Sequence, residues 1–522
     1  MVKSGEGLPT VPRGLTSRAL GGMLWTFSGT GVQAVVQIAV LMALGRLLTP
    51  AEFGIMGAAA VVIALSQIVS QIGVGPALIQ RRELRPAHVR VAITLSCTLG
   101  ILLGAAVYAG APAIARFYRI PEVEPVLRVV AFLFPLDGLN TVAKSLLSRD
   151  LRFRLFVALD VSSYVAGYAA VSVGLALLGF GVWALVWANL AQVALRTVVM
   201  YVATRHPVRP SMDLQAGRDL LSFGLGHSIA QIGTVLSQQG DNLVVGRWLG
   251  PAALGVYGRA YSLMVMPASA FGRIVNRVLF PVMAQVQDER ERLAGAYERA
   301  LAIVALVSLP ISTFLWVVAP EFIPLVLGPG WASVVLPFRL FTVSLLFRMS
   351  SKISDACTKA AGEVYVRALL QVAFAALVVI GALIGQRWGV GGVAVAVSIA
   401  MGINWLTMAQ LSRTVTGLAW VRYGGAHVPA ALLAVLMGTC AAVAAEAGRA
   451  AHAGNVAVVF SAALSAAAAA CLVIRWRPAL FLGPHGTWAL ARAVELVRRR
   501  RAGRPDPAGT EGIAAVAKRV VK

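Results

Sequence analysis

The chain has 522 residues, of which 58% are hydrophobic and only 13% are charged. A soluble domain carries about 25% charged residues, so this composition excludes a soluble enzyme, a disordered protein and a fibrous protein. The formal net charge is +24, but most basic residues lie in short segments between long apolar runs, which is typical of membrane topology signals rather than of nucleic-acid-binding surfaces. We therefore expect a polytopic membrane protein that has no nucleic-acid partner.

Apolar runs of about 20 residues, the length that crosses a bilayer as a helix, recur along the whole chain. The fourteen predicted spans are 20–44, 55–78, 92–111, 126–147, 156–177, 182–203, 220–246, 256–283, 300–318, 334–350, 368–385, 390–411, 428–445 and 455–474. The first run is too long for a cleaved signal sequence, so we expect it to be retained. The predicted fold class is an all-α polytopic membrane protein.

The basic residues between the spans are unevenly divided between the two sides of the membrane. The side of the N-terminus holds 32 of them and the opposite side holds 6, so the positive-inside rule predicts that both termini are cytoplasmic. All loops are short, which leaves no room for a soluble catalytic domain, and we do not expect an enzyme. The basic stretch 491–501 either lies along the anionic leaflet or belongs to a disordered tail that fixes the topology.

The four cysteines indicate no covalent or metal chemistry. Each lies inside an apolar run, without the spacing of a disulfide pair or of a metal site. They are Cys97, Cys357, Cys440 and Cys471. We expect no metal and no cofactor.

An internal repeat organises the chain. Residues 45–59 match residues 246–260 at a constant offset of 201, with eight of fifteen positions identical. The offset places the first span on the seventh, so each repeat holds six spans and both enter the membrane from the same side. Such parallel repeats bind substrate between the halves and rock against each other.

The repeat divides the chain into domains. The predicted domains are a cytoplasmic N-terminus at 1–19, a six-helix bundle at 20–203, a cytoplasmic linker at 204–219, a second six-helix bundle at 220–411, two additional transmembrane helices at 428–474 and a basic cytoplasmic tail at 475–522.

Polar stripes run along the first and seventh spans at helical spacing. The first stripe is Thr26, Thr30, Gln33 and Gln37, and the second, at the same offset of 201, is His227, Gln231, Thr234 and Gln238, continued by Asp241. Lipid cannot satisfy such groups. They either line a water-filled central cavity or join helices by hydrogen bonds.

Ionisable residues inside the spans are costly and therefore point to function. They form three groups: Asp137, Asn140, Thr141 and Lys144; Arg273, Asn276 and Arg277; and Arg348, Lys352, Asp355 and Lys359. An excess of arginine and lysine suits an anion, above all a phosphate. We therefore predict that a cationic cavity binds an anionic substrate, above all a phosphate, through Arg273, Arg277, Arg348, Lys352 and Lys144.

Two further interpretations remain open for these charged residues. Lys352, Lys359 and Arg277 lie towards the predicted cytoplasmic ends of their spans, where they could instead extend to lipid headgroups. Asp137 and Asp241 are candidates for proton or sodium coupling.

The two repeat blocks carry a family resemblance. Residues 45–57, GRLLTPAEFGIMG, and residues 241–258, DNLVVGRWLGPAALGVYG, resemble the polysaccharide transporter, or Wzx-type flippase, family of the multidrug/oligosaccharidyl-lipid/polysaccharide (MOP) exporter superfamily. The resemblance implies a MATE-like pair of six-helix bundles in the bacterial inner membrane. The prolines and glycines of the blocks are carried over as turn residues.

The resemblance also implies a function. It is the transfer of undecaprenyl-diphosphate-linked oligosaccharide across the inner membrane for exopolysaccharide, capsule or O-antigen (lipopolysaccharide) assembly, by alternating access. The expected partners are the lipid-linked oligosaccharide, the bilayer and the polysaccharide polymerase or co-polymerase machinery. The alternatives are a multidrug antiporter of the same superfamily, which would need acidic cavity residues, and a membrane-embedded polysaccharide polymerase or ligase, which typically needs a large periplasmic loop.

Overall fold

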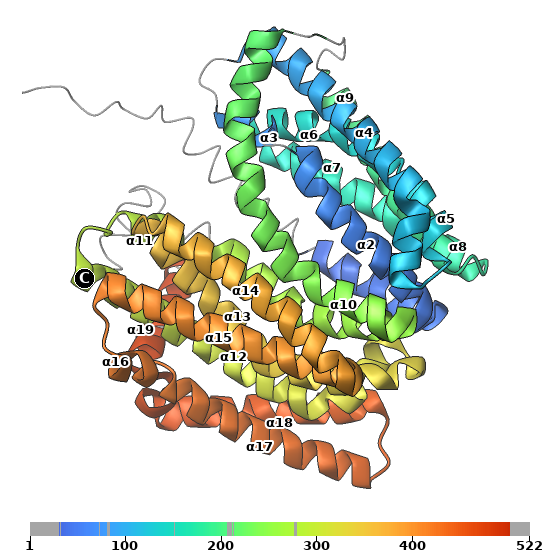
Figure 1. The fold of residues 1–522 in the computed structure, drawn as a ribbon. Helices are drawn as coiled ribbons and strands as arrows, with labels where there is room; N and C mark the ends of the chain where they lie inside the picture. Colours follow the sequence, from blue (N-terminus) through green and yellow to red (C-terminus); the bar gives the residue numbers. More distant parts are fainter. Residues whose placement is uncertain are drawn as a thin grey trace, which may run out of the picture. The chain divides into compact units, whose positions relative to one another are not determined.

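The computed structural model describes residues 31, 33–71, 74–80, 84–150, 152–205, 211, 213–275 and 279–501. Within these ranges the chain is almost entirely helical and contains no strand (Figure 1). Nine helical segments of this part of the chain are long and apolar enough to cross a membrane. The predicted all-α polytopic fold class is therefore confirmed, whereas the count of fourteen spans stays a prediction.

The chain forms two compact units. Unit 1 comprises residues 1–235 and 250–252, and unit 2 comprises residues 236–249 and 253–522. The helices of unit 1 after the apolar segment Gln33–Leu47 are α2 (Pro50–Gln71), α3 (Val74–Gln80), α4 (Pro86–Tyr118), α5 (Val123–Val130), α6 (Leu133–Arg149), α7 (Phe153–Ser163), the π-helix η1 (Tyr164–Ala169), α8 (Ala170–Leu177) and α9 (Val182–Thr204).

The first repeat block forms a helix start with a capping box. Thr49 precedes Pro50, and its hydroxyl donates to Glu52 Oε2 at 2.9 Å. The backbone N–H of Thr49 donates to the same carboxylate oxygen at 2.6 Å. These bonds satisfy groups that a helix N-terminus leaves open, and Pro50 occupies the first helical position, where a missing N–H costs nothing.

Close backbone contact joins α4 to α6 in unit 1. A Cβ atom on Gly100 would lie 2.5 Å from the carbonyl oxygen of Phe134, and one on Gly138 would lie 2.5 Å from the carbonyl oxygen of Ser96. Only glycine permits this approach. Helix α6 in turn packs against α9, which fixes the polar residues of α6 described below.

Unit 2 begins within the long helix α10 (Leu214–Ile274), whose earlier residues belong to unit 1. The following helices are α11 (Phe280–Ala284), α12 (Arg290–Leu327), η3 (Pro329–Val334), α13 (Val335–Ala360), α14 (Val364–Gly385), η4 (Gln386–Trp388), α15 (Gly389–Thr416), α16 (Trp420–Gly425), α17 (Val428–Ala450), α18 (Asn455–Trp476) and α19 (Pro478–Arg501).

Helix α10 is broken at Gly250, where φ is 85° and ψ is −178°. This backbone conformation is accessible to glycine and strained for other residues. Pro251 follows directly, as Pro50 follows Thr49 in the first block. Both repeat blocks thus place a proline immediately after an interruption of helix, whereas the block glycines Gly54, Gly57, Gly255 and Gly258 lie inside helices, so for them the predicted role as turn residues is wrong.

The core of unit 2 lies between α12, α13 and α15. Tyr297 and Leu301 of α12 are buried in one cluster with Leu345, Met349 and Ile353 of α13, and α14 packs against α15. Helices α17 and α18 pack together and against α12. Figure 1 shows α17 and α18 side by side as two orange-red ribbons.

An ion pair joins α17 to α12. Arg449 of α17 donates from Nε and Nη2 to the two carboxylate oxygens of Glu321, at 2.8 and 3.0 Å. Glu321 is buried, so this two-pronged contact compensates a charge that would otherwise be costly.

The predicted spans and the observed helices correspond closely. In its described residues, every predicted span from 55–78 onward lies on a helix or on consecutive helices, whereas the span 20–44 falls partly outside the described part of the chain. The basic stretch 491–501 lies at the end of the helix α19 (Pro478–Arg501), and both interpretations of its role stay predictions. Residues 502–522 lie outside the ranges that the structure describes. The domain boundaries expected from the repeat stay predictions.

Candidate functional site

A charged face follows α13 in unit 2. Arg348, Lys352, Asp355 and Lys359 are spaced by four, three and four residues on this continuous helix, so they share one side of it. Arg348 and Lys352 are like charges one turn apart, an arrangement that costs free energy unless an anion compensates it. The face therefore concentrates positive charge and suits the binding of an anion.

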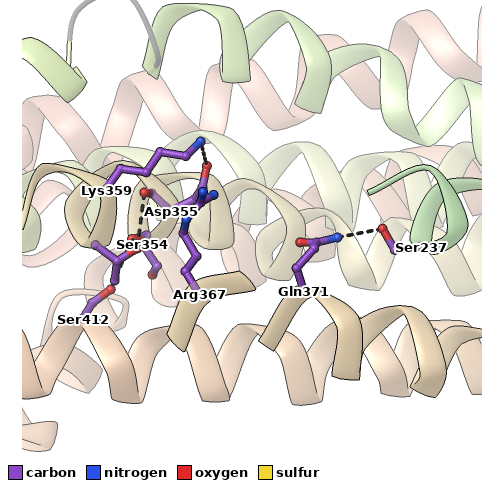
Figure 2. A network of polar contacts seen from close by, with 8 residues as sticks. Ser237, Ser354, Asp355, Lys359, Arg367, Gln371 and Ser412 are labelled. Atoms are coloured by element: carbon purple, nitrogen blue, oxygen red, sulfur yellow. Dashed lines mark hydrogen bonds and ion pairs between the residues drawn. The ribbon is translucent and has the colours of Figure 1, made fainter. Parts of the chain in front are cut away.

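Asp355 is the centre of an ion-pair network. Its Oδ2 accepts a hydrogen bond from Lys359 Nζ at 2.6 Å, and its Oδ1 accepts one from Arg367 Nη1 at 2.7 Å. Figure 2 shows Lys359 and Arg367 directed towards this carboxylate. Arg367 belongs to α14, so the network joins two helices. All three side chains are partly exposed, between 23% and 35%.

A second contact ties α14 to the unit 2 part of α10. Gln371 Nε2 donates to Ser237 Oγ at 2.8 Å (Figure 2). The stem of Lys352 lies close to α10 as well, because a Cβ atom on Gly272 would be 4.0 Å from Lys352 Cγ and Cδ. The charged face of α13 is thus bordered by α10 and α14.

An aromatic array connects the charged face to a buried acid. Arg348 Nη1 donates to the hydroxyl of Tyr261 at 2.7 Å, and Tyr261 is stacked on Tyr257 with ring centroids 6.3 Å apart. The Tyr257 hydroxyl donates to Asp241 Oδ2 at 2.6 Å. Asp241 is only 1% exposed. Asp241 and Tyr257 lie on opposite sides of the helix break at Gly250, so their hydrogen bond spans that break.

The chemistry of this site is that of an anion receptor. The exposed face has four cations but only one carboxylate, Asp355. The cations are Arg348, Lys352, Lys359 and Arg367. Guanidinium and ammonium groups are the donors that phosphate oxygens favour. Within the described residues no group of three or more histidine, cysteine or acidic side chains is arranged to hold a metal.

Unit 1 contains a separate polar cluster around Arg196 of α9. Its Nη2 lies 3.3 Å from Asp137 Oδ1, and its Nη1 lies 3.8 Å from Asp160 Oδ1. The amide of Asn140, in the orientation that satisfies both groups, accepts from Arg196 Nη2 at 3.0 Å and from Nε at 2.9 Å. Asp137, predicted as a coupling residue, is therefore ion-paired within its own unit.

The other predicted site residues are placed as follows. Lys144 is exposed on α6, two turns beyond Asp137. Gln33, Gln37 and Thr234 are half-buried and Gln238 is exposed, all on helices. Thr26, Thr30 and Arg277 lie outside the described residues, and the structure describes only the backbone of His227, Gln231 and Arg273. Their predicted roles stay predictions.

Two residues of these clusters are not singled out by the sequence. Arg367 follows a short polar segment and has the character of a topology signal, and Arg196 is a lone charge in an otherwise apolar span. The signal that could have found Arg196 is the presence of Asp137 and Asp160 in neighbouring spans, because a charge inside a membrane requires a partner. Arg367 lies just outside the predicted span 368–385, where a basic residue is typical of a topology signal, so the sequence indicates no partner for it.

Comparison with solved structures defines the class of fold. The structure of the lipid II flippase MurJ in an inward closed conformation superimposes with a TM-score of 0.71 over 87% of this chain and 99% of that one, at 11% identity. An inward-facing multidrug resistance MATE family transporter of the MOP superfamily gives a TM-score of 0.58 over 74% of this chain and 96% of that one, at 19% identity. The fold of this chain is therefore the one that these two transporters have.

Sequence comparison defines the family. Residues 43–336 match the family model described as polysaccharide biosynthesis protein, and the chain belongs to that family. Both repeat blocks lie inside the matched region, so the resemblance to the polysaccharide transporter family is confirmed.

Individual relatives agree with this assignment. The lipopolysaccharide biosynthesis protein WzxC of Escherichia coli (strain K12) is 26% identical over 336 residues, 64% of this chain and 68% of that protein. The teichuronic acid biosynthesis protein TuaB of Bacillus subtilis (strain 168) is 27% identical over 342 residues, 64% of this chain and 70% of that protein. The succinoglycan biosynthesis transport protein ExoT of Rhizobium meliloti (strain 1021) is 29% identical over 326 residues, 62% of this chain and 65% of that protein. The chain is a multi-pass protein of the bacterial cytoplasmic membrane.

Proposed function

We propose that this protein is a flippase that transfers undecaprenyl-diphosphate-linked oligosaccharide repeat units from the cytoplasmic to the periplasmic leaflet. The product serves the assembly of an exopolysaccharide, a capsule or an O-antigen. The named relatives act in polysaccharide biosynthesis, and one is a transport protein. The observation that carries the proposal is the group of four cations on α13 and α14, of which only Lys359 and Arg367 contact the single carboxylate Asp355.

The proposed substrate contact is electrostatic. Arg348 and Lys352 bind the diphosphate, together with the predicted contributors Arg273, Arg277 and Lys144, and the polar stripes of the first and seventh spans bind sugar hydroxyls. Transport proceeds by alternating access, as the duplicated bundles suggest. A potential that is negative in the cytoplasm favours outward movement of the anion by about 2.3 kcal/mol per charge per 100 mV.

The same proposal covers the finer points of topology and partners. Both termini are cytoplasmic, the protein is a transporter without enzymatic activity, and its product passes to a polysaccharide polymerase or co-polymerase. Proton or sodium coupling through Asp241 is supported only by the burial of that carboxylate. Asp137 is less suited to coupling, because Arg196 already compensates its charge.

The two alternative functions fit the site less well. A multidrug antiporter for organic cations would require acidic groups in the site, whereas the α13 face carries an excess of cations. A polymerase would act on substrate that has already crossed the membrane. In cells that lack a flippase, carrier-linked repeat units accumulate in the cytoplasmic leaflet, and in cells that lack a polymerase they accumulate in the periplasmic leaflet.

Removing the cations tests the proposal in cells. We expect the double variant Arg348→Gln, Lys352→Gln to reduce polysaccharide export at least tenfold at normal expression, because the diphosphate loses two charged donors. Arg339→Gln is the matched control, since Arg339 is on the same helix but donates to the carbonyl oxygen of Trp316 at 3.0 Å. Full export by the double variant would contradict the proposed site.

A further inference from the structure

The proposed phosphate site contains one acidic side chain, Asp355, beside its cations. Asp355 accepts charge-assisted hydrogen bonds from Lys359 of α13 and from Arg367 of α14, at 2.6 and 2.7 Å. Each of its two oxygens thus faces a separate cation. A phosphate group would present two of its oxygens to the same pair of donors in a similar way.

The cations have more donor capacity than Asp355 uses. Arg367 Nε is buried and has no hydrogen-bond partner among the described residues. Lys352, one turn before Asp355, has no ion pair with any side chain in the described part of the chain. A buried donor that is left unsatisfied is costly. The cluster is therefore incompletely compensated by Asp355 and has donors to offer a second anion.

A carrier that returns empty must also tolerate this cluster without its substrate. Four cations on adjacent helix faces repel one another and are expensive to keep in a low-dielectric environment. A carboxylate held within the cluster lowers that cost while the site is empty. When the substrate is bound, the same carboxylate repels the phosphate and competes with it for Lys359 and Arg367.

We propose that Asp355 is an internal competitor for the phosphate groups of the substrate. In the empty protein it occupies Lys359 and Arg367, and an incoming diphosphate displaces it from them. After translocation the carboxylate competes for these donors again and promotes release. This inference rests on the proposed function and adds to it a residue that sets affinity and turnover.

Binding to the purified full-length protein in detergent tests the competitor role. The probes are farnesyl diphosphate and inorganic pyrophosphate, with farnesol as the uncharged control. We expect Asp355→Asn to bind farnesyl diphosphate at least tenfold more tightly than the wild type, because the amide is nearly isosteric but no longer competes as an anion. Asp355→Glu, which keeps the carboxylate, should bind with an affinity close to that of the wild type.

The matched control is Asp160→Asn in unit 1. Asp160 is also partly exposed and lies near an arginine, with 3.8 Å between its Oδ1 and Arg196 Nη1, but it is not part of the α13 cluster. Its substitution should leave the affinity unchanged. A double variant, Asp355→Asn with Arg367→Gln, should lose the gain in affinity, because the donor that was released is no longer present.

The outcomes distinguish this inference from the proposed function. Unchanged or weaker binding of farnesyl diphosphate by a folded Asp355→Asn protein would mean that Asp355 only positions the cations, and would overturn the inference. Equal affinity of the wild type for farnesyl diphosphate and farnesol would exclude an anion site and overturn it as well. Tighter binding by Asp355→Asn, combined with full polysaccharide export in cells that lack the protein, would support the competitor role and contradict the proposed function.

Discussion

Asp241 shows how a single buried charge is stabilised in unit 2. It is 1% exposed, and its carboxylate accepts from the Tyr257 hydroxyl at 2.6 Å and from the backbone N–H of Asn242 at 2.8 Å. A buried carboxylate without such donors would be strongly destabilising. The hydrogen bond to Tyr257 therefore stabilises the helix break at Gly250 that it spans.

Tyr257→Phe removes this donor and leaves the aromatic packing intact. We expect the free energy of unfolding to fall by about 1–3 kcal/mol, the cost of leaving a buried polar group unsatisfied. Thermal unfolding of the purified protein in detergent measures the change. Tyr365→Phe serves as the control, because Tyr365 is 90% exposed. Equal melting temperatures for the two variants would argue against a stabilising role for the Tyr257 hydroxyl.

At the residue scale, the sequence predicts groups that lie on one helix and misses partners from other helices. The spacing of Arg348, Lys352, Asp355 and Lys359 is enough to place them on one face, because helical geometry is local. The contact between Asp355 and Arg367 depends on how α13 and α14 pack, which no periodicity reveals. The pairing of Arg196 with Asp137 likewise depends on helix packing, and the sequence indicates only that each of these charges needs a partner within the membrane.

At the element scale, the apolar runs predict the helices well but not their ends. The span predicted at 334–350 continues as α13 to Ala360, because the polar residues after Arg348 keep helical spacing although hydropathy falls. Likewise α12 extends from Arg290 to Leu327, well beyond the predicted 300–318. Hydropathy reports the part of a helix that can contact lipid, whereas the backbone hydrogen bonds continue past it.

Small residues determine how closely the helices of unit 2 approach. The end of α14 meets the start of α15 at Gly385 and Gly392, where a Cβ atom on Gly385 would lie 2.5 Å from the carbonyl oxygen of Gly392. In a membrane such close packing supplies much of the association free energy, because lipid provides no hydrophobic driving force between helices.

Gly385→Ala should therefore force α14 and α15 apart. We expect a loss of about 1–3 kcal/mol in the free energy of unfolding from overpacking, measured by thermal unfolding in detergent. Gly295→Ala in α12 is the matched control, since apart from its chain neighbours and the backbone of its own helix no atom lies within 4 Å of the place its methyl group would take, and it should be neutral or slightly stabilising. A neutral effect of Gly385→Ala would show that the contact is more compliant than its geometry indicates.

At the scale of the whole molecule, the composition and the internal repeat are the features of the sequence that predict the membrane class and the fold. The membrane class follows from 58% hydrophobic and 13% charged residues, and the MATE-like fold is expected from the family resemblance of the two blocks near Pro50 and Pro251. The orientation of the termini and the residues that bind substrate depend on the surrounding lipid and on the substrate itself. Those features stay predictions that require transport measurements.

Transport in proteoliposomes tests the flippase function most directly. A polyprenyl-diphosphate-linked oligosaccharide is placed in the membrane, and a membrane-impermeant glycosidase reports the fraction in the outer leaflet over time. We expect the purified protein to exchange substrate between leaflets, with the Arg348→Gln, Lys352→Gln variant at least tenfold slower and the Arg339→Gln variant unchanged. A distribution identical to that of protein-free vesicles, or equal rates for wild type and double variant, would contradict a flippase that binds its substrate through these cations.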